Sequence, residues 1–211
     1  MLDYGIFYEF IPMEEIESEN PKVLTLDEVE LYKNYAVMIS TNAGLWRYKI
    51  GDTVKFTSKT PYRIKISGRT KHFINAFGEE LIIENAERAV TRACEATGAV
   101  LTDYTAGPVY INDCQQGCHE WIIEFSQEPD NQEVFNNVLD ETLREINSDY
   151  DAKRYKDMVL KAPKINVVPH ETFYTWMRNR GKLGGQHKVP RLSNSREFLE
   201  EILLVAKEVL V

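Results

Sequence analysis

Apolar and polar residues alternate in several short segments of the first third of the chain. In the segment 62–67, Tyr62, Ile64 and Ile66 occupy every second position, which is typical of a strand with one buried face. Turn-forming residues, among them Gly51 and Pro61, separate such segments. The pattern predicts strands over residues 5–10, 35–41, 45–50, 53–57 and 62–67, so we expect this part of the chain to be rich in β-structure.

The spacing of apolar residues changes to that of a helix after Glu79. Apolar residues recur at helical spacing from Leu81 to Ala96, and Gly98 stands where a glycine would end the helix. Beyond it, the pattern predicts strands over residues 99–104, 109–112, 120–125 and 164–168, and helices over residues 132–146, 171–179 and 195–210. Strands and helices do not alternate strictly, so we expect an α+β domain that begins near Gly68.

Length, composition and charge narrow the classes of function. The chain has 211 residues, of which 43% are hydrophobic, enough for a buried core. A formal charge of −8 repels phosphate backbones and anionic lipid, so we expect no nucleic-acid partner. No apolar run approaches the roughly 18 residues of a spanning helix, and we expect no membrane partner.

Cysteine usage points to a reducing compartment. The three cysteines form an odd number and no disulfide-like framework, so we expect the cytoplasm. Cys114, Cys118 and His119 form the pattern C-x3-C-H, which lacks the second pair of ligands that a structural zinc site needs. We therefore expect no metal site built from these residues.

The segment GLWRYKIGD, residues 44–52, ends a predicted strand with a glycine and a single carboxylate. A carboxylate accepts two hydrogen bonds at once, so Asp52 is a candidate for binding the 2′ and 3′ hydroxyls of a ribose. Gly51 would let the backbone approach such a ligand closely. The alternative is structural, with Gly51 and Asp52 forming an ordinary hairpin turn between two strands.

Two further segments carry candidate basic residues. In GRTKHFINAFGEELIIENAERA, residues 68–89, Arg69 could contact a nucleotide and Lys71 could lie at a hinge; the alternative is a connection with solvated charges. The segment RGKLGGQHKVPRL, residues 180–192, combines glycines with basic residues, and Lys188 could offset charge that develops on a phosphate. It does not fit a Walker loop, since Lys182 is followed by leucine, and the alternative is a flexible surface loop.

Taken in order, these segments resemble the adenylate-forming superfamily. YKIGD resembles its strand motif Y-[RK]-x-G-D, and GRTKHFINAFG resembles its hinge motif. The closer similarity is to the Gretchen Hagen auxin-responsive family of acyl acid amido synthetases. FYEFIP, GLWRYKIGD, ETFYTWM and QHKVPRL resemble successive segments of that family, and the similarity spans nearly the whole chain.

The resemblance implies an enzyme that activates a carboxylic acid with ATP and Mg²⁺ as an acyl-adenylate and transfers the acyl group to an amine. Residues 1–68 would be the end of the β-rich part of the amino-terminal adenylation domain, and residues 69–211 a small α/β carboxy-terminal lid domain. The roles implied for single residues are ribose binding by Asp52, lining of the nucleotide site by Tyr48, a nucleotide contact by Arg69, the hinge at Lys71, and charge stabilisation by Lys188, with Lys182 as the second candidate.

The sequence also departs from the family pattern. Trp46 stands where the family commonly has tyrosine, and the stretch after the hinge motif is bacterial-like rather than plant-like. The phosphate-binding loop and the acyl pocket would belong to an amino-terminal domain missing from this chain, so we expect the chain alone to be inactive. Two alternatives stay open: a thioester-forming, acyl-CoA relative, and a stand-alone, non-catalytic binding or regulatory module.

Overall fold

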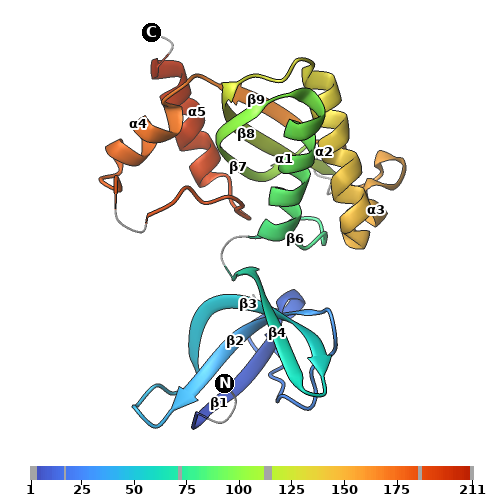
Figure 1. Cartoon of the computed structure of the whole chain (residues 1–211), viewed down its shortest axis with the longest axis vertical. Coiled ribbons are helices and arrows are strands. Elements are labelled where there is room, and N and C mark those ends of the chain that lie inside the picture. Colours follow the sequence, from blue (N-terminus) through green and yellow to red (C-terminus); the bar gives the residue numbers. More distant parts are fainter. Residues whose placement is uncertain (1–3, 17, 71–72, 112–115, 185–186, 210–211) are drawn as a thin grey trace. The chain divides into compact units, whose positions relative to one another are not determined.

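The chain forms two compact units, residues Met1–Lys71 and His72–Val211 (Figure 1). The computed structural model describes residues 4–16, 18–70, 73–111, 116–184 and 187–209. Strands and helices are mixed within it, which confirms the expected α+β class. Among the described residues, no helix combines the length and the apolar character that crossing a membrane requires.

The first unit is a four-stranded antiparallel sheet. Its strands follow one another in sequence and in space in the order β1-β2-β3-β4, with a short 3-10 helix, η1, after the first. The bounds are β1 Ile6–Pro12, η1 Met13–Glu15, β2 Asn34–Thr41, β3 Tyr48–Lys59 and β4 Tyr62–Arg69. One face carries the core, in which Phe10 and Tyr35 pack edge-on against Phe56 with ring centroids 5.0 and 6.1 Å apart. Edge-to-face packing of this kind is favoured by the ring quadrupoles.

Strand β3 differs from the sequence prediction. We expected two strands, 45–50 and 53–57, with a turn at Gly51, whereas the structure has one continuous strand. Met38 pairs with Lys49 and Ala36 with Thr53, so the three residues 50–52 of β3 lie opposite the single Val37 of β2. Gly51 has φ +85°, which the bulge requires and which glycine adopts without strain. The hairpin-turn interpretation of Gly51 and Asp52 is therefore wrong.

The second unit has a three-stranded sheet between two layers of helices. Strand order is β7-β8-β9, with β8 antiparallel to β7 and parallel to β9, and a small hairpin of β5 and β6 precedes the first helix. The bounds are β5 Phe73–Ile74, β6 Leu81–Ile82, α1 Ile83–Thr97, β7 Val100–Tyr110, β8 Gly117–Gln127, α2 Gln132–Ile146, α3 Ser148–Arg154, η2 Tyr155–Asp157, β9 Lys164–Val168, α4 Thr172–Asn179 and α5 Glu197–Val209.

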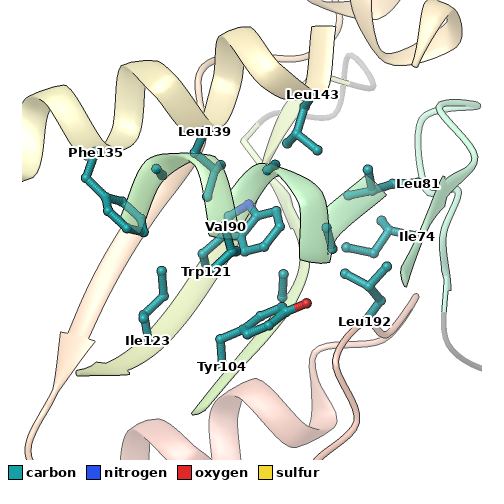
Figure 2. Packing of buried hydrophobic residues seen from close by; sticks show 14 of the residues in the cluster. Ile74, Leu81, Val90, Tyr104, Trp121, Ile123, Phe135, Leu139, Leu143 and Leu192 are labelled. Atoms are coloured by element: carbon teal, nitrogen blue, oxygen red, sulfur yellow. The ribbon is translucent and has the colours of Figure 1, made fainter. Parts of the chain in front are cut away.

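Strand β8 lies in the middle of this sheet and is buried on both faces. Trp121 and Ile123 point into the larger core, which helices α1 and α2 cover, as Figure 2 shows for Val90 of α1 and Leu139 of α2. Ile122 points to the other face and packs in a second core with helices α4 and α5. Alternate residues of a strand face opposite sides, so one strand supplies both cores.

The bounds of some helices and strands agree with those predicted from the local sequence pattern, and others differ. Helix α2 and strand β9 have the predicted bounds, and Gly98, at φ +66°, ends α1 as predicted. Leu81 and Ile82, taken as the start of the helix, instead form strand β6, and residues 99–112, predicted as two strands, contain the single strand β7. Helix α3 was not predicted, because buried side-chain contacts rather than an apolar period stabilise it.

Candidate functional site

Asp52 and Arg69 lie side by side in the first unit. Strands β3 and β4 pair these two residues directly, and Nε of Arg69 is 3.3 Å from Oδ1 of Asp52. The side chain of Asp52 is 40% exposed and that of Arg69 is 59% exposed. An ion pair so open to water contributes little to stability, about 0–1 kcal/mol. Both groups therefore remain available to a ligand.

The backbone next to this pair is fixed at Gly51. Its carbonyl oxygen accepts a hydrogen bond from the backbone N–H of Thr70 at 2.9 Å, directly after β4 ends. A Cβ placed on Gly51 would lie 3.9 Å from Nη2 of Arg69, an ordinary contact. Glycine is therefore needed here for its positive φ rather than for space.

A cavity of about 1080 Å³ lies on the apolar face of the first unit, and Asp52 is one of its few acidic or basic residues. Most of its wall is apolar, including Phe56 and the partly exposed Ile64 and Ile66. Tyr48 lies at the start of β3 opposite Ile39, is 53% exposed, and stands outside the described residues that line the cavity. The structure thus brings Asp52 and Arg69 together, and neither Arg69 nor Tyr48 is among the described residues that line the cavity.

Lys182 and Lys188 lie in the second unit, on the segment between α4 and α5. Both are exposed, and both line one cavity of about 570 Å³ together with His170 and His187. Phe173 of α4 also lines this cavity. Basic side chains, Lys182, Lys188 and Arg191, and acidic ones, Asp103, Glu124 and Glu171, are mixed in its wall. An anionic ligand would therefore need the lysines in particular. The hinge candidate Lys71, and Gln186 of the motif QHKVPRL, lie outside the described residues.

A buried carboxylate also borders this cavity. Glu124 of β8 is 2% exposed and accepts hydrogen bonds from the backbone N–H groups of Glu171, at 2.9 Å, and Phe173, at 3.0 Å. It therefore satisfies the start of helix α4, where an anion would otherwise be favoured. Attraction of an anionic ligand to this cavity must come from its basic side chains rather than from the helix.

Sequence reasoning missed a buried contact between a histidine and a glutamate. Nε2 of His119 lies 2.7 Å from Oε1 of Glu79, and both side chains are fully buried. The other oxygen of Glu79 accepts the backbone N–H of Phe77 at 2.7 Å. These contacts tie the turn between β5 and β6 to β8. The only available signal was a glutamate after a glycine, which occurs in countless turns.

The described residues contain no group of three or more histidine, cysteine, aspartate or glutamate side chains that could hold a metal ion. Mg²⁺ in nucleotide enzymes is held by one or two carboxylates together with substrate phosphates and water.

Matches to one family of known proteins extend over both units of the chain. The GH3 family central domain matches residues 1–69, and the GH3 family C-terminal domain matches residues 84–197. The indole-3-acetic acid-amido synthetase GH3.3 of Arabidopsis thaliana is 27% identical over 92% of this chain and 34% of its own length. The jasmonoyl-L-amino acid synthetase JAR4 of Nicotiana attenuata is 28% identical over 88% of this chain and 33% of its own length.

A solved structure shares the fold. The GH3.15 acyl acid amido synthetase matches with a TM-score of 0.67 at 21% identity, over 94% of this chain and 36% of that chain. The present chain thus spans about a third of the length of the curated relatives it matches.

Proposed function

The chain belongs to the GH3 family, and from this premise we propose that it is the carboxy-terminal part of an ATP-dependent ligase that joins a carboxylic acid to an amine. The membership confirms the resemblance found in the sequence. The observation that carries the proposal is the ordered match of both family domains, since the matched relatives include an indole-3-acetic acid-amido synthetase and a jasmonoyl-L-amino acid synthetase. An amine acceptor is accordingly favoured over the thiol of a thioester-forming relative.

The proposed reaction has two steps. One carboxylate oxygen of the acid attacks the α-phosphorus of ATP, the bond from that phosphorus to the bridging oxygen breaks, and pyrophosphate leaves with the bonding electrons. The amine nitrogen then attacks the acyl carbon, AMP leaves, and the nitrogen loses a proton. Negative charge therefore grows on the leaving pyrophosphate in the first step and on the phosphate of the leaving AMP in the second, and a cation beside the pyrophosphate is useful in the first step.

We propose roles for the basic and acidic side chains accordingly. Asp52 accepts hydrogen bonds from the ribose hydroxyls, and Arg69, 3.3 Å away, contacts the nucleotide beside it, with Tyr48 at the edge of the nucleotide site. Lys188 offsets the charge on the phosphates, with Lys182 as the second candidate. One preorganised donor of this kind is worth about 3 kcal/mol in the transition state.

We further propose that residues 69–211 act as a lid that turns about Lys71, and that residues 1–68 complete the amino-terminal adenylation domain. Turning would withdraw Lys188 after the first step and admit the amine.

Since the relatives are about three times as long, the activity requires an amino-terminal part supplied with this chain. The apolar face of the first unit, where Ile64 and Ile66 are exposed, is the surface that this part would cover. Action in the cytoplasm on small-molecule acids and amines belongs to the same proposal.

Calorimetric titration of the chain with Mg-ATP and with AMP tests the nucleotide site. We expect AMP binding that weakens about tenfold in Asp52→Ala, since a hydrogen bond to a charged group is worth about 1.5–3 kcal/mol. The matched control is Glu30→Ala, which removes the carboxylate of another exposed ion pair in the same unit, that with Lys33. Equal affinity of the Asp52 variant would contradict the ribose role. Absence of nucleotide binding by the unaltered chain would favour the non-catalytic binding module.

A further inference from the structure

Lys182 and Lys188 lie on a segment with several glycines, and such segments lose much conformational entropy when ordered. A lysine on an unrestrained segment would meet a phosphate only rarely. The lysines can contribute to a reaction only if the chain on both sides of them is fixed. The described residues show how each end is held.

Arg180 fixes the first end, directly after helix α4. Its guanidinium lies 5.0 Å from the ring centroid of Trp176 and 5.1 Å from that of Phe198, and these two rings pack edge-on with centroids 5.9 Å apart. Nη1 of Arg180 also donates to Oε2 of Glu201 at 2.7 Å, and the same oxygen accepts Nε1–H of Trp176 at 2.8 Å. Phe198 and Glu201 belong to α5, so Arg180 joins the end of α4 to α5.

Arg191 fixes the second end in the same way. Its guanidinium lies 4.6 Å from the ring centroid of Tyr104 and is paired with the carboxylate of Asp103. It also donates to the backbone oxygen of Tyr104 at 3.2 Å. Asp103 and Tyr104 belong to β7, so this end is attached to the sheet. Each arginine therefore contacts both an aromatic ring and a carboxylate of one neighbouring element, α5 for Arg180 and β7 for Arg191.

The backbone is held at the same two places. The N–H of Lys182 donates to the oxygen of Met177 at 2.9 Å, immediately after Arg180. At the other end, the hydroxyl of Thr105 donates to the oxygen of Pro190 at 2.6 Å, and the N–H of Ala106 to the oxygen of Arg191 at 2.9 Å. Each lysine thus lies within three residues of an anchored arginine.

We propose that Arg180 and Arg191 are positioning residues, whose stacked and carboxylate-paired guanidiniums hold residues 181–184 and 187–188 so that Lys182 and Lys188 face the cavity they line. The role of the lysines rests on the proposed function, whereas the anchoring does not. Arginine is required because its planar guanidinium stacks on a ring and pairs with a carboxylate at the same time. Lysine keeps the charge and loses that combination.

Amide hydrogen exchange of the chain tests the anchoring. We expect Arg180→Lys and Arg191→Lys to exchange about fivefold faster in the segment of residues 181–184 and 187–188, as the loss of one cation–π contact predicts, with α2 unchanged. Arg144→Lys is the control, because Arg144 pairs with Asp151 at the surface and stacks on no ring among the described residues. Glu201→Gln and Asp103→Asn are expected to reproduce the effect if a lysine variant fails to fold. Unchanged exchange in the segment, or faster exchange throughout the second unit, would overturn the proposal.

A kinetic measurement separates positioning from simple stabilisation. In the enzyme assembled with its amino-terminal part, we expect the arginine variants to lower kcat of ATP–pyrophosphate exchange about tenfold while KM for ATP changes less than about twofold. A change in KM alone would overturn the positioning role. If the unaltered enzyme showed no exchange reaction, the proposed function would fail, and the hydrogen-exchange result would still decide the anchoring.

Discussion

Arg154 is expected to be among the most sensitive positions of the second unit. It makes a two-pronged contact with Asp140, from Nε to Oδ1 at 2.9 Å and from Nη2 to Oδ2 at 2.7 Å, and donates to the oxygen of Leu160 at 3.0 Å. The side chains of Arg154 and Asp140 are 8% and 13% exposed. The hydrogen bond to Asp140 raises the pKa of Arg154, so the guanidinium is charged at any working pH.

The substitution Arg154→Met keeps much of the side-chain volume and leaves the carboxylate of Asp140 buried with the hydroxyl of Tyr150 as its remaining side-chain partner, at 2.7 Å. Removing one member of a buried pair costs about 3–5 kcal/mol. Arg144→Met is the control, because Arg144 and Asp151 are 44% and 49% exposed, and its expected cost is about 0–1 kcal/mol.

Urea unfolding followed by tryptophan fluorescence measures these free energies of unfolding. Trp121 is fully buried in the second unit, whereas Trp46 of the first unit is 83% exposed, so the signal reports chiefly on the second unit. Replacing both charged partners, Arg154→Met with Asp140→Leu, should recover most of the loss. A loss below about 1 kcal/mol for Arg154→Met would refute the reasoning that this pair is buried and desolvated.

Two further predictions concern β8. Burial raises the pKa of Glu120, but hydrogen bonds from Lys164, Arg196 and Asn166 outweigh it and leave that pKa below its ordinary value. The ionised Glu120 therefore stabilises the fold above about pH 4.3, and this contribution is lost as the pH falls through the lowered pKa. The free energy of unfolding should then fall less steeply with decreasing pH in Glu120→Gln than in the unaltered chain. An equal slope in both would contradict this. Gly117→Ala should lower the free energy of unfolding by at least about 2 kcal/mol in urea, because its Cβ would meet a carbonyl oxygen at 2.4 Å; a neutral result would show that the backbone can move.

Local patterns predicted the elements whose formation depends on neighbours in sequence. Helix α2 has the predicted bounds because its apolar residues recur on one face and Asn131 caps its start, with its side chain accepting the N–H groups of Glu133 and Val134. Strand β9 was predicted for a similar reason, since a short apolar run is sufficient. Alternation cannot reveal a bulge, because the extra residues opposite Val37 depend on how two strands pair.

The contacts of the candidate site likewise could not be predicted from local sequence patterns. Asp52 and Arg69 could be singled out as residue types, but their pairing depends on the register of β3 and β4. The anchors of the lysine segment join residues far apart in sequence, such as Arg191 and Asp103. An arginine beside an apolar core and an arginine in solvent look alike in a sequence, so only the fold could distinguish them.

Acid-dependent exchange of pyrophosphate into ATP tests the central claim most directly, in the enzyme that joins this chain to its amino-terminal part. The account predicts exchange only when a carboxylic acid is supplied, a loss of about a hundredfold in Lys188→Ala, and little change in Lys207→Ala, which removes an exposed lysine of α5. Exchange that does not depend on an acid, or that survives in Lys188→Ala at the level of the control, would contradict it.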